Sequence, residues 1–156
     1  MNKFLYRKSS SIILLFGFVF ILFVFFKVAP YEWTLLVSLL SALISFVYFY
    51  QQHKKEELKI FIQLFEKFNQ RYDKMNNDLN QILEKSELDE VDRLKLYDYF
   101  NLCGEEYLYY SRGYIFDEVW EAWQNGMKYF LKSKLIYKLW KEEEETNSYY
   151  GLKIYL

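Results

Sequence analysis

Residue types that commonly carry out catalysis are scarce in this chain of 156 residues. The only histidine, His53, follows an apolar run and begins a basic cluster, where contact with lipid headgroups is the expected role. Glu105 and Glu106 cannot face one site on a helix, because adjacent side chains point about 100° apart. Glu118 and Glu121 have a spacing that could share a metal, but acidic residues normally complement a helix N-terminus. We therefore expect no catalytic residue, no metal site and no cofactor, and a protein that is not an enzyme.

One group of residues has the composition of a binding site. Residues 128–141 hold five lysines and no acidic residue, and three of these lysines recur at i, i+4 and i+7 on one helix face. Lysines that neutralise phosphates, next to aromatic rings that stack on bases, suit a nucleotide ligand. The candidate ligand-binding residues are Lys134, Lys138, Lys141, Tyr137 and Arg112. One alternative is an amphipathic helix with its lysines in solvent, and another is a lysine face toward the membrane surface, which the distance from the spans disfavours. These interpretations stay open.

Overall charge and cysteine content narrow the partners and the compartment. The formal net charge is −1, so the chain has no general basic character and we expect no binding to duplex nucleic acid. The single cysteine, Cys103, excludes an internal disulfide and fits a reducing compartment. We expect Cys103 to act as a small, buried apolar residue.

Two apolar segments near the N-terminus predict a transmembrane hairpin. The spans cover about residues 9–27 and 33–50, close to the roughly 20 residues that a bilayer core requires. A cleaved signal peptide fits less well, because no small-residue cleavage site follows the first run and a second run comes at once. Basic residues precede the first span and follow the second, which places both termini in the cytoplasm. Residues 1–52 are thus predicted to be a multi-pass membrane hairpin.

Residues 53–156 are predicted to form a small cytosolic helical domain whose long first helix covers residues 53–85. Apolar side chains in this helix alternate at spacings of three and four, which is a seam that requires a partner helix. The seam consists of Leu58, Phe61, Phe65, Phe68, Tyr72, Met75, Leu79 and Ile82. The partner is either the C-terminal helices of the same chain or a second copy. We expect a homo-oligomer in either case.

Capping signals predict three further helices, so the whole chain is expected to be all-α. The first of them starts at Ser86 with Asp89 and ends at Arg112–Gly113, where glycine suits the C-cap. Its apolar positions are Val91, Leu94, Tyr97, Phe100, Cys103, Tyr107 and Leu108. The next helix opens at Asp117, and the last follows Ser133 as its N-cap.

Two glycines and the C-terminal tail allow further predictions about helix packing, a helix end and the conformation of the tail. Gly104, inside a predicted helix, indicates close approach of another helix. Asn125–Gly126 leaves open an early end to the helix that starts at Asp117. Residues 148–156 alternate loosely between apolar and polar types, which favours an extended tail that could pair with its counterpart in an oligomer.

Four segments in the soluble part carry a resemblance to known proteins: Tyr97–Cys103, Glu105–Tyr107, Gly113–Ile115 and Val119–Met127. These segments look like a widespread family of uncharacterised bacterial helical proteins. The match covers most of residues 60–152. It implies a helical fold and no known activity.

In its overall plan the chain resembles the small membrane effectors of type III CRISPR systems. The resemblance is carried by the size, the two N-terminal spans and the compact soluble domain. It implies a bacterial inner-membrane sensor and effector of antiviral defence, which binds cyclic tetra-adenylate, a cyclic oligoadenylate, as an oligomer and then perturbs the lipid bilayer. The alternative is a non-enzymatic membrane-anchored adaptor that binds a protein partner through its aromatic-rich helices. A small toxin acting through the spans alone is a third possibility.

Overall fold

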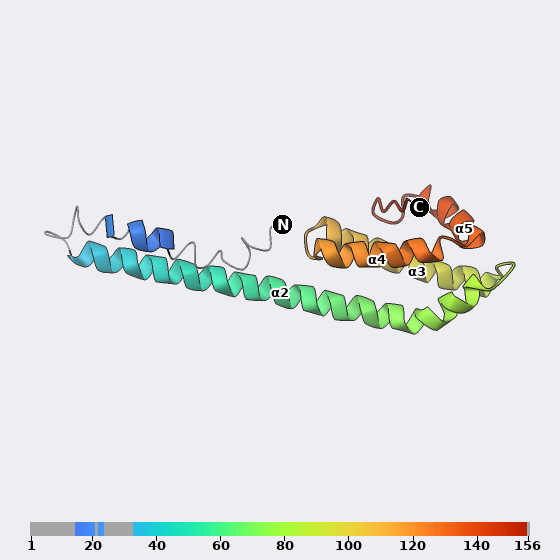
Figure 1. Cartoon of the computed structure of the whole chain (residues 1–156), viewed down its shortest axis with the longest axis horizontal. Coiled ribbons are helices and arrows are strands. Elements are labelled where there is room, and N and C mark those ends of the chain that lie inside the picture. Colours follow the sequence, from blue (N-terminus) through green and yellow to red (C-terminus); the bar gives the residue numbers. More distant parts are fainter. Residues whose placement is uncertain (1–14, 21, 24–32, 156) are drawn as a thin grey trace. The chain divides into compact units, whose positions relative to one another are not determined.

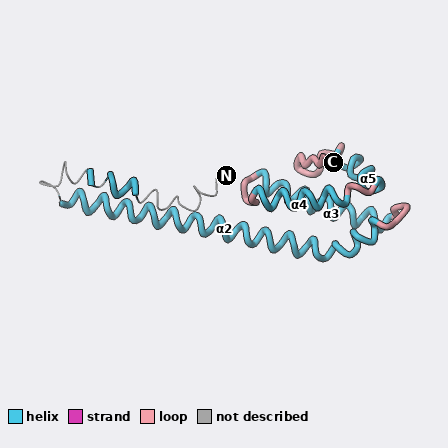
Figure 2. The backbone as a smooth tube through the Cα atoms, in the orientation of Figure 1, coloured by secondary structure: helices cyan, strands magenta, loops and turns pink. Residues whose placement is uncertain are grey.

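In a computed structural model of the chain, the described residues are 15–20, 22–23 and 33–155, and they contain helices and loops but no strand (Figures 1 and 2). The all-α prediction is therefore confirmed. The helices that can be bounded are α2 (Trp33–Leu83), α3 (Glu90–Ser111), α4 (Asp117–Phe130) and α5 (Lys134–Glu144).

The chain divides into two compact units, Met1–Leu58 and Lys59–Leu156, and α2 runs through the boundary. No proline or glycine occurs within α2, so nothing in its sequence breaks the backbone ladder. The long helix expected over residues 53–85 is the second part of α2, which continues without a break from the apolar first part. The division falls after Leu58, slightly later than the predicted boundary at residue 52.

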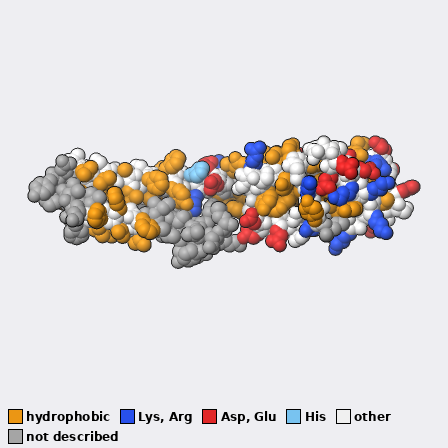
Figure 3. All heavy atoms as spheres, turned by 90° about the horizontal axis from the view of Figure 1, so that it is seen from above, with side chains coloured by type: hydrophobic (Ala, Val, Ile, Leu, Met, Phe, Trp, Pro, Cys, Tyr) orange, Lys and Arg blue, Asp and Glu red, His pale blue; other side chains and the backbone are white. Residues whose placement is uncertain are grey.

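The membrane-type character of the first unit lies in the N-terminal part of α2. Among the described residues, α2 is the one helix long and apolar enough to cross a bilayer. Its large apolar side chains are exposed, including Trp33 at 67%, Ile44 at 65% and Phe49 at 70%, and Figure 3 shows apolar side chains gathered over this part. A water-soluble surface rarely exposes such a patch, whereas a lipid-facing surface requires one.

The other half of the predicted hairpin, about residues 9–27, falls largely outside the described residues. Residues 15–20 and 22–23 within it are helical. Gly17 lies against the side chain of Leu43, so that a Cβ added to Gly17 would meet Leu43 Cδ1 at 2.5 Å. This is the close packing that a small residue permits between two helices.

The second unit is a helical bundle around one apolar core, and most residues of the predicted seam pack in or against this core. Phe68, Leu79 and Ile82 of α2 are buried, and the core also takes residues from α3, α4 and α5. The C-terminal helices of the same chain are thus a partner of the seam. The first seam residues are less covered, since Leu58 is 44% exposed and Phe65 is 37% exposed.

The boundaries of α3 follow capping chemistry, with a shift at its start. Asp89, not Ser86, is the N-cap, because its side chain accepts a hydrogen bond from the Asp92 amide while the Asp92 side chain accepts from the Asp89 amide. The predicted end at Arg112–Gly113 is confirmed, with Arg112 as the C-cap and Gly113 at a φ of 80°.

The two later helices also begin close to their predicted positions. Asp117 was predicted as the N-cap of α4, but it is the first helical residue and Phe116 is the N-cap, while Ser133 is the N-cap of α5 as predicted. Neither N-cap makes a side-chain hydrogen bond to the helix. Gly126 does not end α4, which continues to Phe130. Burial of Trp120, Met127 and Phe130 holds α4 on the core.

Other details of the second unit differ from the sequence-based expectations. Val91 and Leu94 were expected on the apolar face of α3, but they are 59% and 55% exposed. The element that approaches Gly104 is the C-terminal tail rather than a helix, since a Cβ there would lie 3.3 Å from the Tyr149 Cα. In this tail Leu152 and Ile154 are buried in the core of their own chain.

Candidate functional site

The lysine-rich face of α5 is a consequence of how this short helix packs. Ile136, Leu139 and Trp140 are buried, which fixes one side of α5 on the core. Lys134 and Lys138 lie on the other side and are exposed. Neither lysine forms an ion pair within the part of the chain that the structure describes. Both ammonium groups are therefore available to an anion.

Lys141, the third lysine of the predicted face, already forms an ion pair with a carboxylate of its own helix. Its Nζ lies 2.6 Å from Glu144 Oε2 and 5.6 Å from the centroid of the Tyr137 ring. The hydrogen bond to Glu144 raises the pKa of Lys141. Because Tyr137 is half-buried against the core, only part of its ring is open to a ligand.

A groove of about 220 Å³ adjoins Lys138 where α5 meets the start of α3. It combines two cations, two carboxylates and three leucines, and its lining residues are Glu87, Leu88, Arg93, Leu135, Lys138, Leu139 and Glu142. Sequence reasoning missed Arg93, which lies in a mainly acidic stretch and has no spacing relation to α5. The groove can attract a phosphate through Arg93 and Lys138, and its carboxylates can accept hydrogen bonds from amino groups.

Arg112 is not brought to this groove. It caps the C-terminal end of α3, nineteen residues after Arg93, which corresponds to about 28 Å along a helix. Figure 1 shows α5 beside the opposite end of α3. Of the predicted ligand-binding residues, Lys134 and Lys138 are thus exposed together on α5. Lys141 lies beside Tyr137 but is paired with Glu144, and Arg112 is remote from all of them.

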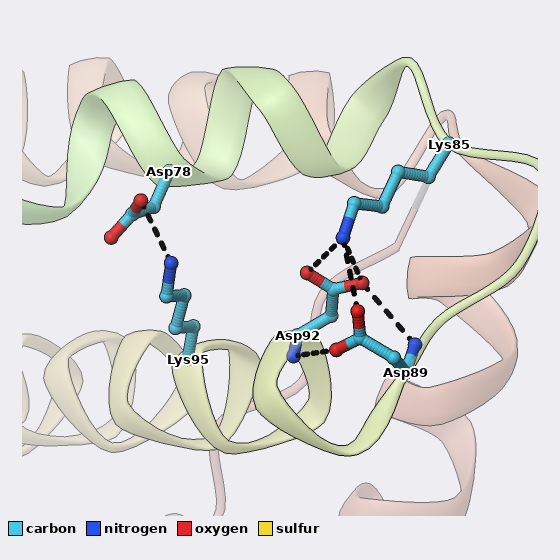
Figure 4. A network of polar contacts seen from close by, with 5 residues as sticks. All are labelled: Asp78, Lys85, Asp89, Asp92 and Lys95. Carbon is cyan, nitrogen blue, oxygen red and sulfur yellow. Dashed lines mark hydrogen bonds and ion pairs between the residues drawn. The ribbon is translucent and has the colours of Figure 1, made fainter.

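A second charged cluster joins the end of α2 to α3 (Figure 4). Lys85 Nζ lies 2.7 and 2.6 Å from the two carboxylate oxygens of Asp92, which is only 4% exposed. The hydrogen bond to Asp92 raises the pKa of Lys85, and the Asp92 amide lowers the pKa of Asp89. Lys95 pairs with Asp78 at 2.8 Å across the same two helices. Since these charges pair with one another, the cluster fixes the turn rather than receiving a ligand.

The most unusual ionisable group is Glu106, which is 6% exposed on the inner side of α3. Burial raises its pKa to about 8, even though the nearby Arg71 charge acts in the opposite direction. Its neighbour Glu105 instead forms a two-pronged ion pair with Arg71, at 2.5 and 3.1 Å. A strongly perturbed pKa is a common property of functional groups, which makes Glu106 a second site to explain.

The remaining groups with possible metal or nucleophilic chemistry are His53, Cys103 and the carboxylates. None of the described residues forms a group of three or more metal-ligating side chains. His53 Nε2 lies 3.3 Å from Glu57 Oε1 on an exposed helix face. Cys103 is a free thiol, and burial raises its pKa well above the ordinary value, which keeps it protonated and unreactive.

Comparison of the chain with protein-family models, with curated proteins and with solved structures found no match. The two resemblances noted in the sequence therefore stay predictions.

Proposed function

We propose that the protein is a membrane-anchored sensor and effector whose helical unit binds an anionic nucleotide second messenger. The observation that carries this proposal is the pair of exposed lysines on α5, Lys134 and Lys138, with Arg93 across the groove from Lys138. Phosphate recognition needs such unpaired cations at fixed positions. Cyclic oligoadenylates of bacterial antiviral defence are the first ligand class to test, because the overall plan of the chain resembles their membrane effectors.

In this proposal the anchor is a two-span hairpin in the bacterial inner membrane, with both termini in the cytoplasm. The exposed apolar side chains of the first part of α2 and the packing of Gly17 against Leu43 support it. Basic residues on the cytoplasmic sides of both spans support the orientation.

Ligand size implies that more than one chain takes part. The groove of about 220 Å³ is smaller than the roughly 300 Å³ at which small-molecule sites usually begin. A cyclic tetranucleotide carries four phosphates, so several α5 faces arranged around one ligand would satisfy it. The site is thus proposed to form in a homo-oligomer, with Lys134 and Lys138 of each chain on the phosphates.

Transmission to the membrane would use α2, because this helix belongs to both units and is uninterrupted. Ligand binding would favour one packing of the bundle against the second part of α2. A ligand shifts such an equilibrium only through its different affinity for the two states. The altered position of α2 would then perturb the bilayer.

Calorimetry of the full chain in lipid nanodiscs, titrated with cyclic tetra-adenylate at two salt concentrations, tests the binding step. We expect binding that weakens at high salt, because phosphate contacts release counterions. The double variant Lys134→Glu/Lys138→Glu should lose binding at least tenfold. Lys67→Glu/Lys74→Glu is the matched control, since it reverses two exposed lysines on α2. Equal affinity of both double variants would contradict the proposal.

An adaptor function is the second candidate, and a specific surface favours it. Val91 and Leu94 of α3 are 59% and 55% exposed, and the exposed acidic residues Glu90 and Asp98 of the same helix lie around them at helical spacing. An apolar pair with an acidic rim suits a basic amphipathic helix of a partner protein. Recovery of one stoichiometric partner that is lost in Val91→Ser/Leu94→Ser, together with no nucleotide binding, would support the adaptor.

A further inference from the structure

The core of the helical unit contains one carboxyl group that has no polar partner at contact distance. Glu106 is 6% exposed and forms no hydrogen bond or ion pair with any other described residue, so the small solvent contact of its carboxyl oxygens is what solvates them. It shares the inner side of α3 with Tyr99 and Cys103, which precede it by seven and three residues and are also buried. A charged carboxylate in such surroundings is costly unless it is paired.

The residues around Glu106 explain why it stays unpaired. On α2, Arg71 is the nearest cation, but both of its terminal nitrogens are committed to Glu105. Tyr72 of α2 also interacts with Glu106 electrostatically, but its hydroxyl donates to Asn76 Oδ1 at 3.1 Å. On α4, Tyr129 interacts electrostatically with Tyr72. The two α2 side chains that interact with Glu106, Arg71 and Tyr72, therefore hydrogen-bond to other residues.

We propose that Glu106 is a proton-binding site built into the bundle, neutral while α3 is packed on α2 and α4, and that loss of its proton loosens this packing. This device lies beyond the proposed nucleotide function and operates without any nucleotide. It would connect the packing of α3 on α2, the helix that continues into the membrane unit, to the proton activity of the cytoplasm.

The other titratable groups of this region ionise later than Glu106, so its transition can be observed by itself. Burial raises the pKa of Tyr72, of Tyr99 and of Cys103 above their ordinary values. Arg71 keeps its charge, since its hydrogen bond to Glu105 raises its pKa further. Glu106, with a pKa of about 8, is therefore the group that changes first on going from neutral to alkaline pH.

Infrared spectroscopy of the full chain in lipid nanodiscs, made from an ether-linked phosphatidylcholine that has neither carboxyl nor ester carbonyl groups, tests the site directly. At pH 7 exposed carboxyl groups are ionised, so a neutral carboxylic-acid band at this pH reports a buried protonated acid. We expect this band in the wild-type protein, and we expect it to disappear with a midpoint near pH 8. Absence of the band in the wild type at pH 7 would overturn the proposal, and this result needs no variant.

Two variants then link the band to packing. Glu106→Gln should lack the band, whereas Glu121→Gln, which changes an exposed carboxyl on α4, should keep it. Near-ultraviolet circular dichroism between pH 7 and pH 9 reports the packing of the aromatic core. The wild type and Glu121→Gln should lose signal over the range in which the band disappears, and Glu106→Gln should not. An identical loss of signal in Glu106→Gln would overturn the proposed link.

Discussion

At the scale of single residues, the protonation of Glu106 has a definite consequence for stability. Its pKa is about 8 in the folded chain against an ordinary value of 4.5. Below pH 4.5 both the folded and the unfolded chain hold the proton. Between pH 4.5 and 8 only the unfolded chain releases it, so the free energy of unfolding falls as pH rises through this window.

Glu106→Gln should remove this pH dependence, because glutamine is nearly the same size and carries no charge. The pKa difference corresponds to about 5 kcal/mol at most, so we expect a more stable variant at pH 8 and little change at pH 4. Thermal unfolding of the full chain, followed by far-ultraviolet circular dichroism at both pH values, measures this. A variant that is less stable than the wild type at pH 8 would show that the ionised carboxylate contributes favourable contacts.

Asp92 is the residue at which a substitution should weaken the α2–α3 turn most. It is buried, accepts two hydrogen bonds from Lys85 and completes the capping box with Asp89. Asp92→Ala should lower the free energy of unfolding by about 2 kcal/mol, from the lost cap and the lost charged hydrogen bonds. Asp98→Ala, an exposed position on the same helix, controls for helix propensity. Equal melting temperatures of the two variants would contradict this role.

Individual residues differ in how well the sequence predicts them. The outward direction of Lys134 and Lys138 follows from helix periodicity alone. Glu105 and Glu106 do lie in different environments, as the angle between neighbours on a helix requires. Which of the two is buried depends on the side of α3 that meets α2, and the sequence of α3 alone does not give that side. Arg93 comes near Lys138 only through the packing of α5 on α3. Periodicity within one helix contains no information about such contacts between helices.

At the scale of the elements, two glycines on helices should respond in opposite directions to the same substitution. Around Gly126 of α4 there is no atom within 4 Å of an added Cβ, so Gly126→Ala should stabilise by about 1 kcal/mol through helix propensity. At Gly104 the added Cβ would lie 3.3 Å from the Tyr149 backbone. Gly104→Ala should therefore lower stability by about 1 kcal/mol and displace the tail. Thermal unfolding measures both, and equal stabilisation would contradict the close packing of the tail.

Helix ends were more predictable than helix faces, for a physical reason. Capping depends on side chains a few residues apart, so Asp89 and Gly113 identify the boundaries of α3 from local sequence, and Asp117 and Ser133 lie within one residue of the starts of α4 and α5. Faces depend on what each helix meets. Val91 and Leu94 continue the apolar spacing of α3 but lie beyond its contacts with the rest of the bundle, and they remain exposed.

At the scale of the whole molecule, membrane insertion of residues 33–50 should depend on their apolar surface. Lysine at the centre of a span costs about 3 kcal/mol, so Leu40→Lys should impair insertion. Ile62→Lys should not, although Leu40 and Ile62 are similarly exposed at 42% and 44%. A glycosylation acceptor added after Leu156, with the chain translated into microsomes, reads out the topology. The acceptor should be modified only in Leu40→Lys. Modification in the wild-type chain would contradict the cytoplasmic C-terminus.

The sequence predicted the all-α class and the division into an apolar and a charged part, because both follow from composition and helical period. The continuity of α2 was also foreseeable from the absence of proline and glycine. Where the division between the units lies was harder to predict, since a continuous helix has no local signal for it.

The most direct test of the whole account is ligand-dependent leakage from liposomes that contain the full chain. Cyclic tetra-adenylate, added on the side of the helical unit, should release an entrapped dye. Release should be lost in Lys134→Glu/Lys138→Glu and retained in Lys67→Glu/Lys74→Glu. Ligand binding without dye release, or equal release with and without the ligand, would contradict the proposal that this protein converts nucleotide binding into a change in the membrane.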